Sequence, residues 1–182
     1  LTTAGVTLAP STNEVVYGRA ARLSGSVPTK QPGQQVTIYA QRLADPSYRL
    51  IATLLTGDGG LWALAVKPAV ATSYKASWGG GTGAPTTIGV RPQVAFRSLG
   101  HGRFLIRVFA GRSFAFRVVK LQRRTAFGTW VTVNRVRLGA RSGATVRAPL
   151  PRGTFRLRVA MSVNQAGAGY LAGISRVVVY RR

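Results

Sequence analysis

Few side chains in this sequence could act as acids, bases, nucleophiles or metal ligands. The 182 residues include no cysteine, one histidine (His101) and three acidic residues, Glu14, Asp45 and Asp58. Without cysteine there is no thiolate nucleophile, disulfide, iron–sulfur cluster or cysteine zinc site. Acid–base catalysis and metal binding mostly use carboxylates and imidazoles, which are nearly missing here. We therefore predict a protein that is not an enzyme, with no catalytic residues, no metal site and no cofactor.

Two short motifs could be mistaken for ligand sites. The stretch Thr56–Gly60 (TGDGG) has one carboxylate where a calcium loop needs several oxygen ligands. Asp58-Gly59 between two apolar stretches instead indicates a hairpin turn. His101 is flanked by glycines, and no acidic residue or second histidine lies in its half of the chain, so we expect an exposed loop histidine. The serines offer no nucleophile elbow, because G-x-S-x-G does not occur with an available base.

The chemistry that the sequence does offer is cationic. Arg and Lys number 26, and the formal net charge is +23. Residues 92–182 contain 18 of these cations and no acidic residue, so only a terminal carboxylate could pair with them internally. Such a surface repels itself at low salt and attracts polyanions such as teichoic acids, acidic polysaccharides, nucleic acids or anionic lipids. The preference for Arg suits bidentate contacts with phosphate or carboxylate, but it also fits a GC-rich genome or a hot habitat.

Short β-strands must position these cations. Stretches of alternating, β-branched and aromatic residues recur along the chain between Gly, Pro, Asp and Ser, and none has the apolar period of a long helix. With 46% apolar residues the chain can form a core, which a disordered basic tail could not. The fold class is therefore all-β. In the first half we expect seven strands, at Val6–Ala9, Ala20–Val27, Gln35–Gln41, Arg49–Thr56, Trp62–Val66, Ser73–Trp78 and Thr86–Arg91.

The second half repeats this pattern. It contains strand candidates at Val94–Arg97, Phe104–Ala110, Val118–Arg123, Trp130–Leu138, Ala144–Ala148, Thr154–Met161 and Ser175–Tyr180. A constant offset of 81 residues relates Gln41 to Gln122, Pro68 to Pro149, and Tyr74 to Phe155. This indicates a tandem duplication of an immunoglobulin-like, seven-stranded β-sandwich, with domains at 1–91 and 92–182. Pro92 and the lack of a Gly/Ser stretch at the junction predict a short rigid linker.

Strand alternation assigns the cations to outward faces. In the strand Thr154–Met161, Phe155 and Leu157 share one face with Val159 and Met161, which leaves arginines on the other. Phe104 and Ile106 repeat this pattern. Near Arg117 the alternation of inward and outward residues is interrupted, which indicates a turn or bulge there. We assign polyanion contacts to Arg103, Arg107, Arg135, Arg137, Arg147, Arg156 and Arg158.

The aromatic residues do not form a recognisable nucleic-acid surface. Most of them alternate inward, and no RRM or KH motif occurs, so we expect no specific nucleic-acid binding. By the same spacing Trp62 and Trp78 belong to the core. For Trp130 two interpretations remain: a core residue, or an exposed platform that stacks on a sugar.

A family resemblance follows from these segments. The pattern VVYG…LSG…VTIYAQR…DGGLWALAVKP…SYKASW, followed by VVKLQRR…GTWVTV…LPRGTFRLRVAMS…GYLAGIS, resembles tandem bacterial Ig-like repeats of secreted and surface proteins of high-GC Gram-positive bacteria. The resemblance covers nearly the whole chain and implies stalks, spacers, adhesive units or appendages, with no catalytic residues. The strong basicity is not a property that the resemblance requires.

Export is the expected fate of the chain. It begins at Leu1 without an initiator Met, which we interpret as a mature, free-standing product whose leader has been removed, although a truncated chain would look the same. No apolar run approaches the ~20 residues that span a bilayer. We therefore predict an extracellular or cell-surface protein with no membrane span.

Two functions are compatible with these features. The first is a self-assembling subunit of a surface filament, pilus-like appendage or coat, joined head-to-tail into an open homo-polymer through terminal and edge strands. We assign that contact to Leu1, Val6, Leu8, Val177, Val179 and Tyr180. The alternative is an adhesive module that binds acidic polysaccharide or a cell-wall polyanion through its second domain. Salt should strengthen assembly of like-charged subunits but weaken polyanion binding.

Overall fold

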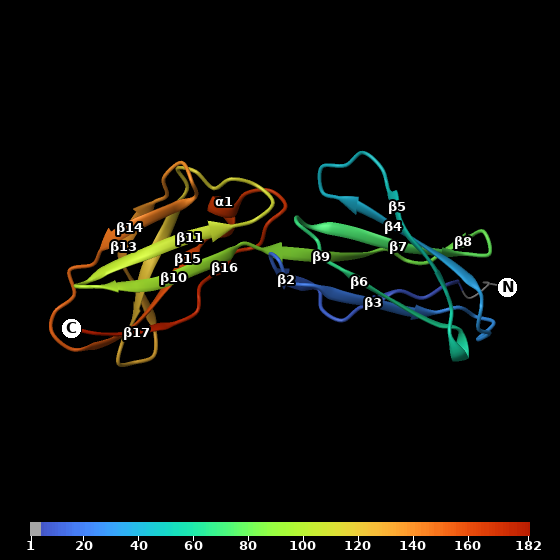
Figure 1. Ribbon diagram of the computed structural model, residues 1–182, viewed down its shortest axis with the longest axis horizontal. Coiled ribbons are helices and arrows are strands. Elements are labelled where there is room, and N and C mark those ends of the chain that lie inside the picture. The colour runs from blue at the N-terminus through green and yellow to red at the C-terminus, as the bar shows by residue number, and fades with distance from the viewer. Residues whose placement is uncertain (1–4) are drawn as a thin grey trace. The chain divides into compact units, whose positions relative to one another are not determined.

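The computed structural model describes residues 5–182, which form strands and turns with little helix (Figure 1). The chain divides into two compact units, Leu1–Val90 and Arg91–Arg182. Each unit contains a three-stranded sheet and a larger sheet. The predicted all-β class and the pair of β-sandwiches are confirmed.

The first unit places a small sheet against a six-stranded one. The small sheet has the order β1 (Ala9–Pro10), β3 (Ala21–Ser26) and β6 (Leu61–Val66). The large sheet has the order β2 (Glu14–Val16), β9 (Thr86–Arg91), β7 (Thr72–Trp78), β4 (Gln35–Arg42) and β5 (Arg49–Leu55), with β8 (Gly81–Thr82) paired to β7. The pairs β4–β5, β4–β7, β7–β8 and β7–β9 are antiparallel. As the last strand in the order, β5 lies at one edge of the large sheet.

The second unit repeats this arrangement. Its small sheet has the order β10 (Gln93–Gly100), β11 (Arg103–Phe109) and β14 (Gly143–Arg147). Its five-stranded sheet runs β13 (Trp130–Arg137), β12 (Val118–Arg124), β15 (Thr154–Met161) and β16 (Gly173–Ile174), with β17 (Val178–Arg181) also paired to β15. A single helical turn, α1 (Val163–Ala166), follows β15.

The two cores are built from the inward residues of these strands. In the first unit the core is mainly aliphatic, with Leu23, Ile38 and Ile88 fully buried and Trp62 only 4% exposed. Burying each such side chain contributes about 1.5–3 kcal/mol. The core placement of Trp62 is thereby confirmed, while Trp78 at the end of β7 is half-buried.

The second core contains a chain of aromatic rings. The rings of Phe96 and Phe104 stack with their centroids 5.5 Å apart, and Tyr180 meets Phe104 edge-on at 5.1 Å. The Tyr180 hydroxyl also accepts a 2.7 Å hydrogen bond from the backbone N–H of Gly102. This hydrogen bond links β17 to the turn between β10 and β11. It also gives the hydroxyl of the buried Tyr180 ring a hydrogen-bond partner.

Several local predictions differ from the structure. Asp58–Gly60 forms a 3₁₀ turn, but it joins β5 to β6 in different sheets and is not a hairpin. Gly60 has φ +67°, and a Cβ there would lie 2.7 Å from Lys30 Cα, so the turn needs glycine. The last predicted strand, Ser175–Tyr180, overlaps only β17, which begins at Val178, and the sequence did not indicate β2, β8, β16 or α1.

Other local predictions are confirmed. The loss of alternation near Arg117 corresponds to a turn in which the Arg117 N–H bonds the Phe114 carbonyl and Phe116 has φ +63°. His101 lies exposed in the turn between β10 and β11, with φ +49°.

Candidate anion-binding site

The outer face of the larger sheet in the second unit carries cations on three adjacent strands. Here β12 lies between β13 and β15, and its register places Lys120 opposite Arg135 and Gln122 opposite Arg158. Directly opposed residues have Cβ atoms about 4.5–5.5 Å apart, so two like charges face each other at Lys120 and Arg135. Both side chains are exposed. The sheet therefore presents positive charge that no neighbouring strand neutralises.

Arg158 is held flat against this face. Its guanidinium carbon lies 4.1 Å from the centroid of the Trp130 ring, and its Nε donates a 2.9 Å hydrogen bond to Gln122 Oε1. Burial lowers the pKa of Arg158 below its ordinary value, although an arginine stays charged at neutral pH. Trp130 is thus a half-buried platform that already carries a cation, and its indole face is covered by Arg158.

The small sheet of the same unit carries a second group of cations. Arg103 on β11 is directly opposite Arg147 on β14, and Arg107 is opposite Gly143. A Cβ on Gly143 would lie 3.1 Å from Arg107 Cγ, which shows that the Arg107 side chain runs across this glycine. All three arginines are exposed.

The structure therefore divides the seven predicted arginines between two sheets. Arg103, Arg107 and Arg147 belong to the small sheet, and Arg135, Arg156 and Arg158 belong to the larger one. Arg137, near the end of β13, packs its guanidinium 5.7 Å from the Phe116 ring.

A pocket opens where the pairing of β12 with β15 stops. The pairing runs from Lys120 and Ala160 to Arg123 and Leu157, and the first residues of β15 then pair only with β17. The space left beside the β12–β13 turn is a pocket of about 840 Å³. It is lined by Arg123, Arg124, Thr125, Ala126, Phe127, Gly128, Thr154, Phe155 and Arg156.

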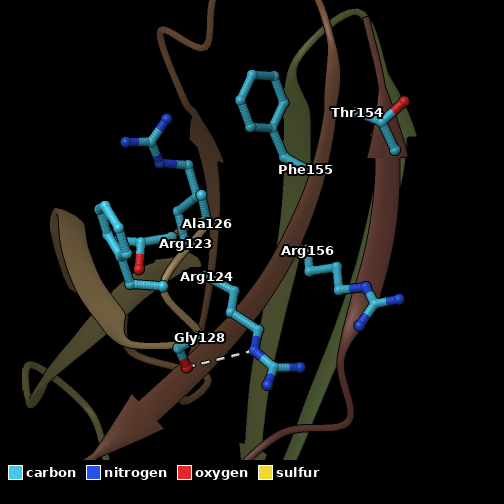
Figure 2. Close-up of a pocket in the computed structure, with 9 residues that line it drawn as sticks. Arg123, Arg124, Ala126, Gly128, Thr154, Phe155 and Arg156 are labelled. Atoms are coloured by element: carbon cyan, nitrogen blue, oxygen red, sulfur yellow. Dashed lines mark hydrogen bonds between the residues drawn. The ribbon is translucent and has the colours of Figure 1, made fainter.

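Three arginines and two phenylalanines dominate this pocket. Figure 2 shows Arg124 and Arg156 extending from neighbouring chain segments, with the Arg124 Nε donating to the Gly128 carbonyl at 3.3 Å. The Arg123 guanidinium lies 5.8 Å from the centroid of the Phe155 ring. Its Nε is buried without a hydrogen-bond partner among the described residues. Phe127, at the tip of the turn, is 94% exposed.

Only Arg156 of this pocket was expected from the sequence. Alternation along a strand predicts which face a side chain occupies, but it does not predict where two strands stop pairing. The available signal was the Arg123-Arg124 pair at a strand end, followed directly by the aromatic turn Thr125–Thr129 (TAFGT).

The residues assigned to subunit contacts fall into two groups. Val6 is 3% exposed and Tyr180 is 8% exposed, so little of either side chain can reach a neighbouring molecule. Leu8 is half-buried, and the preceding residue, Thr7, bonds its N–H to the Ser26 carbonyl of β3 at 2.9 Å.

The remaining assigned residues include two near the C-terminal end of the chain. Val177 and Val179 are 47% and 64% exposed, respectively. Leu1 lies outside the described residues.

The described residues contain neither a cluster of metal ligands nor a membrane-spanning helix. Across residues 5–182, His, Asp and Glu nowhere gather in threes that could hold a metal ion. Within the same residues, no helix has the length and apolar character needed to cross a bilayer.

Comparisons with known proteins support the fold. No protein-family model matches the sequence, and no curated protein matches it. Among solved structures, the chicken interferon gamma receptor alpha chain is similar with a TM-score of 0.52 and 9% identity, covering 99% of this chain and 98% of the receptor chain. A two-domain fibronectin type III segment of chicken tenascin gives a TM-score of 0.48 and 12% identity, covering 98% and 99%.

At this low identity the likeness to the receptor establishes architecture alone. The chain has the fold of two tandem immunoglobulin-like β-sandwich domains. The immunoglobulin-like part of the sequence resemblance is supported, and nothing links the chain to repeats of high-GC Gram-positive bacteria.

Proposed function

We propose that this protein is a non-enzymatic extracellular binding module that holds polyanions on its arginine-rich second unit. The observation that carries the proposal is the pairing of like charges across strands, Arg103 with Arg147 and Lys120 with Arg135, in a region whose sequence has no acidic residue. Opposed like charges destabilise a sheet. An anion bound between them removes that repulsion, so this surface gains more from an anionic ligand than a surface of mixed charge would.

Binding of this kind is driven by charge and by counterion release. Exposed guanidinium groups on both sheets can form bidentate bonds with phosphate, sulfate or carboxylate oxygens. Ions condensed on the polyanion are released as these contacts form. Acidic polysaccharides and cell-wall polyanions match this chemistry outside the cell, where tandem sandwiches of this fold are typical binding or structural modules.

Salt titration tests the proposal. We expect polygalacturonate and polyphosphate to bind the intact protein in calorimetry or fluorescence anisotropy. With 6–10 contacts, affinity should fall about 10³–10⁵-fold between about 50 and 200 mM salt. Neutral dextran serves as the control polymer. Equal binding of dextran, or an affinity that does not change with salt, would contradict the proposal.

A matched pair of variants locates the binding surface. Arg103→Gln with Arg147→Gln removes two exposed cations from the second unit, and Arg19→Gln with Arg22→Gln removes two exposed cations from the first. Both variants lower the net charge equally. We expect the second-unit variant to lose about tenfold or more in polyanion affinity, because charged hydrogen bonds contribute about 1.5–3 kcal/mol each. Equal losses in both variants would contradict a binding surface on the second unit.

Assembly into an open homo-polymer is the second candidate function. It is favoured by exposed apolar residues on two edge strands, Leu50 (59%) and Leu55 (68%) on β5 and Val179 (64%) on β17. An exposed edge can accept a strand from another molecule. Light scattering and electron microscopy at low and high salt test this candidate, because association of like-charged copies should grow with salt.

A further inference from the structure

We infer that the pocket beside the β12–β13 turn is a discrete site for an anionic group carried on a sugar-sized ring. The inference rests on the proposed function and deepens it, because it separates one built site from the diffuse positive surface. Arg123, Arg124 and Arg156 line the same pocket, and residues 92–182 contain no acidic side chain that could neutralise them. An anion in the pocket supplies the missing negative charge and accepts several guanidinium hydrogen bonds.

The turn that forms one wall is held in place by its own hydrogen bonds. The Thr125 N–H bonds the Thr129 carbonyl at 2.8 Å, and the Gly128 N–H bonds the Thr125 carbonyl at 3.1 Å. Gly128 has φ +82°, a conformation that other residues rarely adopt. The bond from Arg124 Nε to the Gly128 carbonyl fixes the arginine while its terminal nitrogens keep their donors. Ordering these groups in advance reduces the entropy lost on binding.

The aromatic residues explain why we infer a ring and not a bare ion. Phe127, which is 94% exposed, and Phe155 both line the pocket. In Figure 2 the Phe155 ring and the Arg156 side chain extend in opposite directions. An exposed phenylalanine adds nothing to the core, whereas it can cover the apolar face of a ligand ring. The pocket volume of about 840 Å³ lies within the range of small-ligand sites. Phosphate, sulfate and carboxylate share the required chemistry.

NMR titration of the ¹⁵N-labelled intact protein tests the inference. The probes are glucose 6-phosphate, glucose 6-sulfate and glucuronate, which distinguish the three anionic groups. Two controls each lack one feature: glucose has the ring but no charge, and inorganic phosphate has the charge but no ring. We expect saturable shifts confined to Arg123–Gly128 and Thr154–Arg156 with one or more of the charged sugars. Glucose should cause no such shifts, and inorganic phosphate should bind at least several-fold more weakly.

Three variants separate the contributions of charge and ring. Arg124→Gln should weaken binding of the charged sugar about tenfold, because it removes a charged hydrogen-bond donor. Phe127→Ser should lower the affinity for the charged sugar to a value close to the affinity for inorganic phosphate. Arg141→Gln is the matched control, since Arg141 is exposed in another turn and does not line the pocket. It should change the affinity by less than about twofold, because screening weakens its distant charge.

The outcomes distinguish this inference from the proposed function. If polyanions bind but shifts spread over the second unit, and Arg124→Gln behaves like Arg141→Gln, the discrete site is refuted and the proposed function stands. If charged sugars bind the pocket but no polyanion binds with salt dependence, the proposed function is refuted and the site stands. Binding of inorganic phosphate as strong as that of the charged sugars would refute the role assigned to the ring.

Discussion

The two units share one arrangement of strands but differ in the charge of their surfaces. Each has a small antiparallel sheet and a larger one. On the larger sheet of the first unit, Lys75 is directly opposite Tyr39, and its ammonium nitrogen lies 4.4 Å from the ring centroid of Tyr48 and 5.5 Å from that of Tyr39. On the larger sheet of the second unit, Lys120 and Arg135 face each other. Outward positions do not fill the core, so the fold permits both surfaces and does not itself require the arginines.

The edge strands of the two larger sheets also differ in charge, with more cations in the second unit. In the first unit, β5 begins at Arg49 and continues with the uncharged residues Leu50–Leu55. This strand therefore forms a mostly apolar edge. In the second unit, the edge strand β13 carries Arg135 and Arg137. Charged side chains at an edge hinder pairing with another chain. The first unit is therefore the better candidate for contact with a neighbouring molecule, and the second for contact with polyanions.

The aromatic core of the second unit gives the largest expected effect. Phe104 is fully buried and contacts both Phe96 and Tyr180. Phe104→Ala should lower the free energy of unfolding of this unit by about 3–5 kcal/mol, because it leaves a cavity among rings that cannot collapse. Calorimetry should show the transition of the second unit moving to lower temperature while that of the first unit stays in place.

Phe127→Ala provides the control for that prediction. It removes the same side chain from an exposed position and should change stability by no more than about 0.5 kcal/mol. Similar losses in the two variants would mean that the aromatic chain does not hold the second unit together.

The hydroxyl of Tyr180 gives the next largest effect. Tyr180→Phe keeps the ring but removes the acceptor of the Gly102 N–H in a buried position. The cost should be about 1–3 kcal/mol, because the backbone donor is left without a partner. Hydrogen exchange should show faster exchange of the Gly102 amide. Unchanged exchange there would contradict the role of this bond in fastening β17.

Charge placed on the apolar edge tests the difference between the edges. If copies associate through β5, Leu55→Lys should raise the concentration needed for association at high salt by about tenfold, as charged edges resist pairing. Val179→Lys makes the matched change on β17, whose edge already carries Arg181. Analytical ultracentrifugation measures both variants. A larger effect of Val179→Lys would reverse the assignment and favour the second unit as the contact.

The smallest effect concerns the first unit in alkaline solution. Burial raises the pKa of Tyr74, with opposing contributions from its bond to Thr72 and from Arg42. The folded protein therefore keeps the phenol proton after the unfolded chain has lost it. This contribution to stability is complete below pH about 10 and is lost as the pH rises above that value. In denaturant unfolding, Tyr74→Phe should make the free energy of unfolding fall less steeply as the pH rises above about 10. An unchanged dependence on pH would contradict the role assigned to Tyr74.

The sequence by itself determined the class of fold and the sign of the surface. Alternation of apolar and polar residues in segments such as Thr154–Met161 predicts a strand and assigns Arg156 and Arg158 to its outward side, because successive side chains point to opposite faces. The lack of acidic residues in the second half is fixed by composition. The turn near Arg117 also followed from a local break in this alternation.

Tertiary structure alone decided which of these residues meet. Register places Arg103 beside Arg147 and Gln122 beside Arg158, and the end of the β12–β15 pairing opens the pocket between Arg124 and Arg156. Contacts of this kind join residues far apart in the chain, so no local pattern encodes them. The burial of Val6 and Tyr180 has the same origin, since an apolar residue near a chain end is equally suited to its own core or to a neighbour until the packing around it is known.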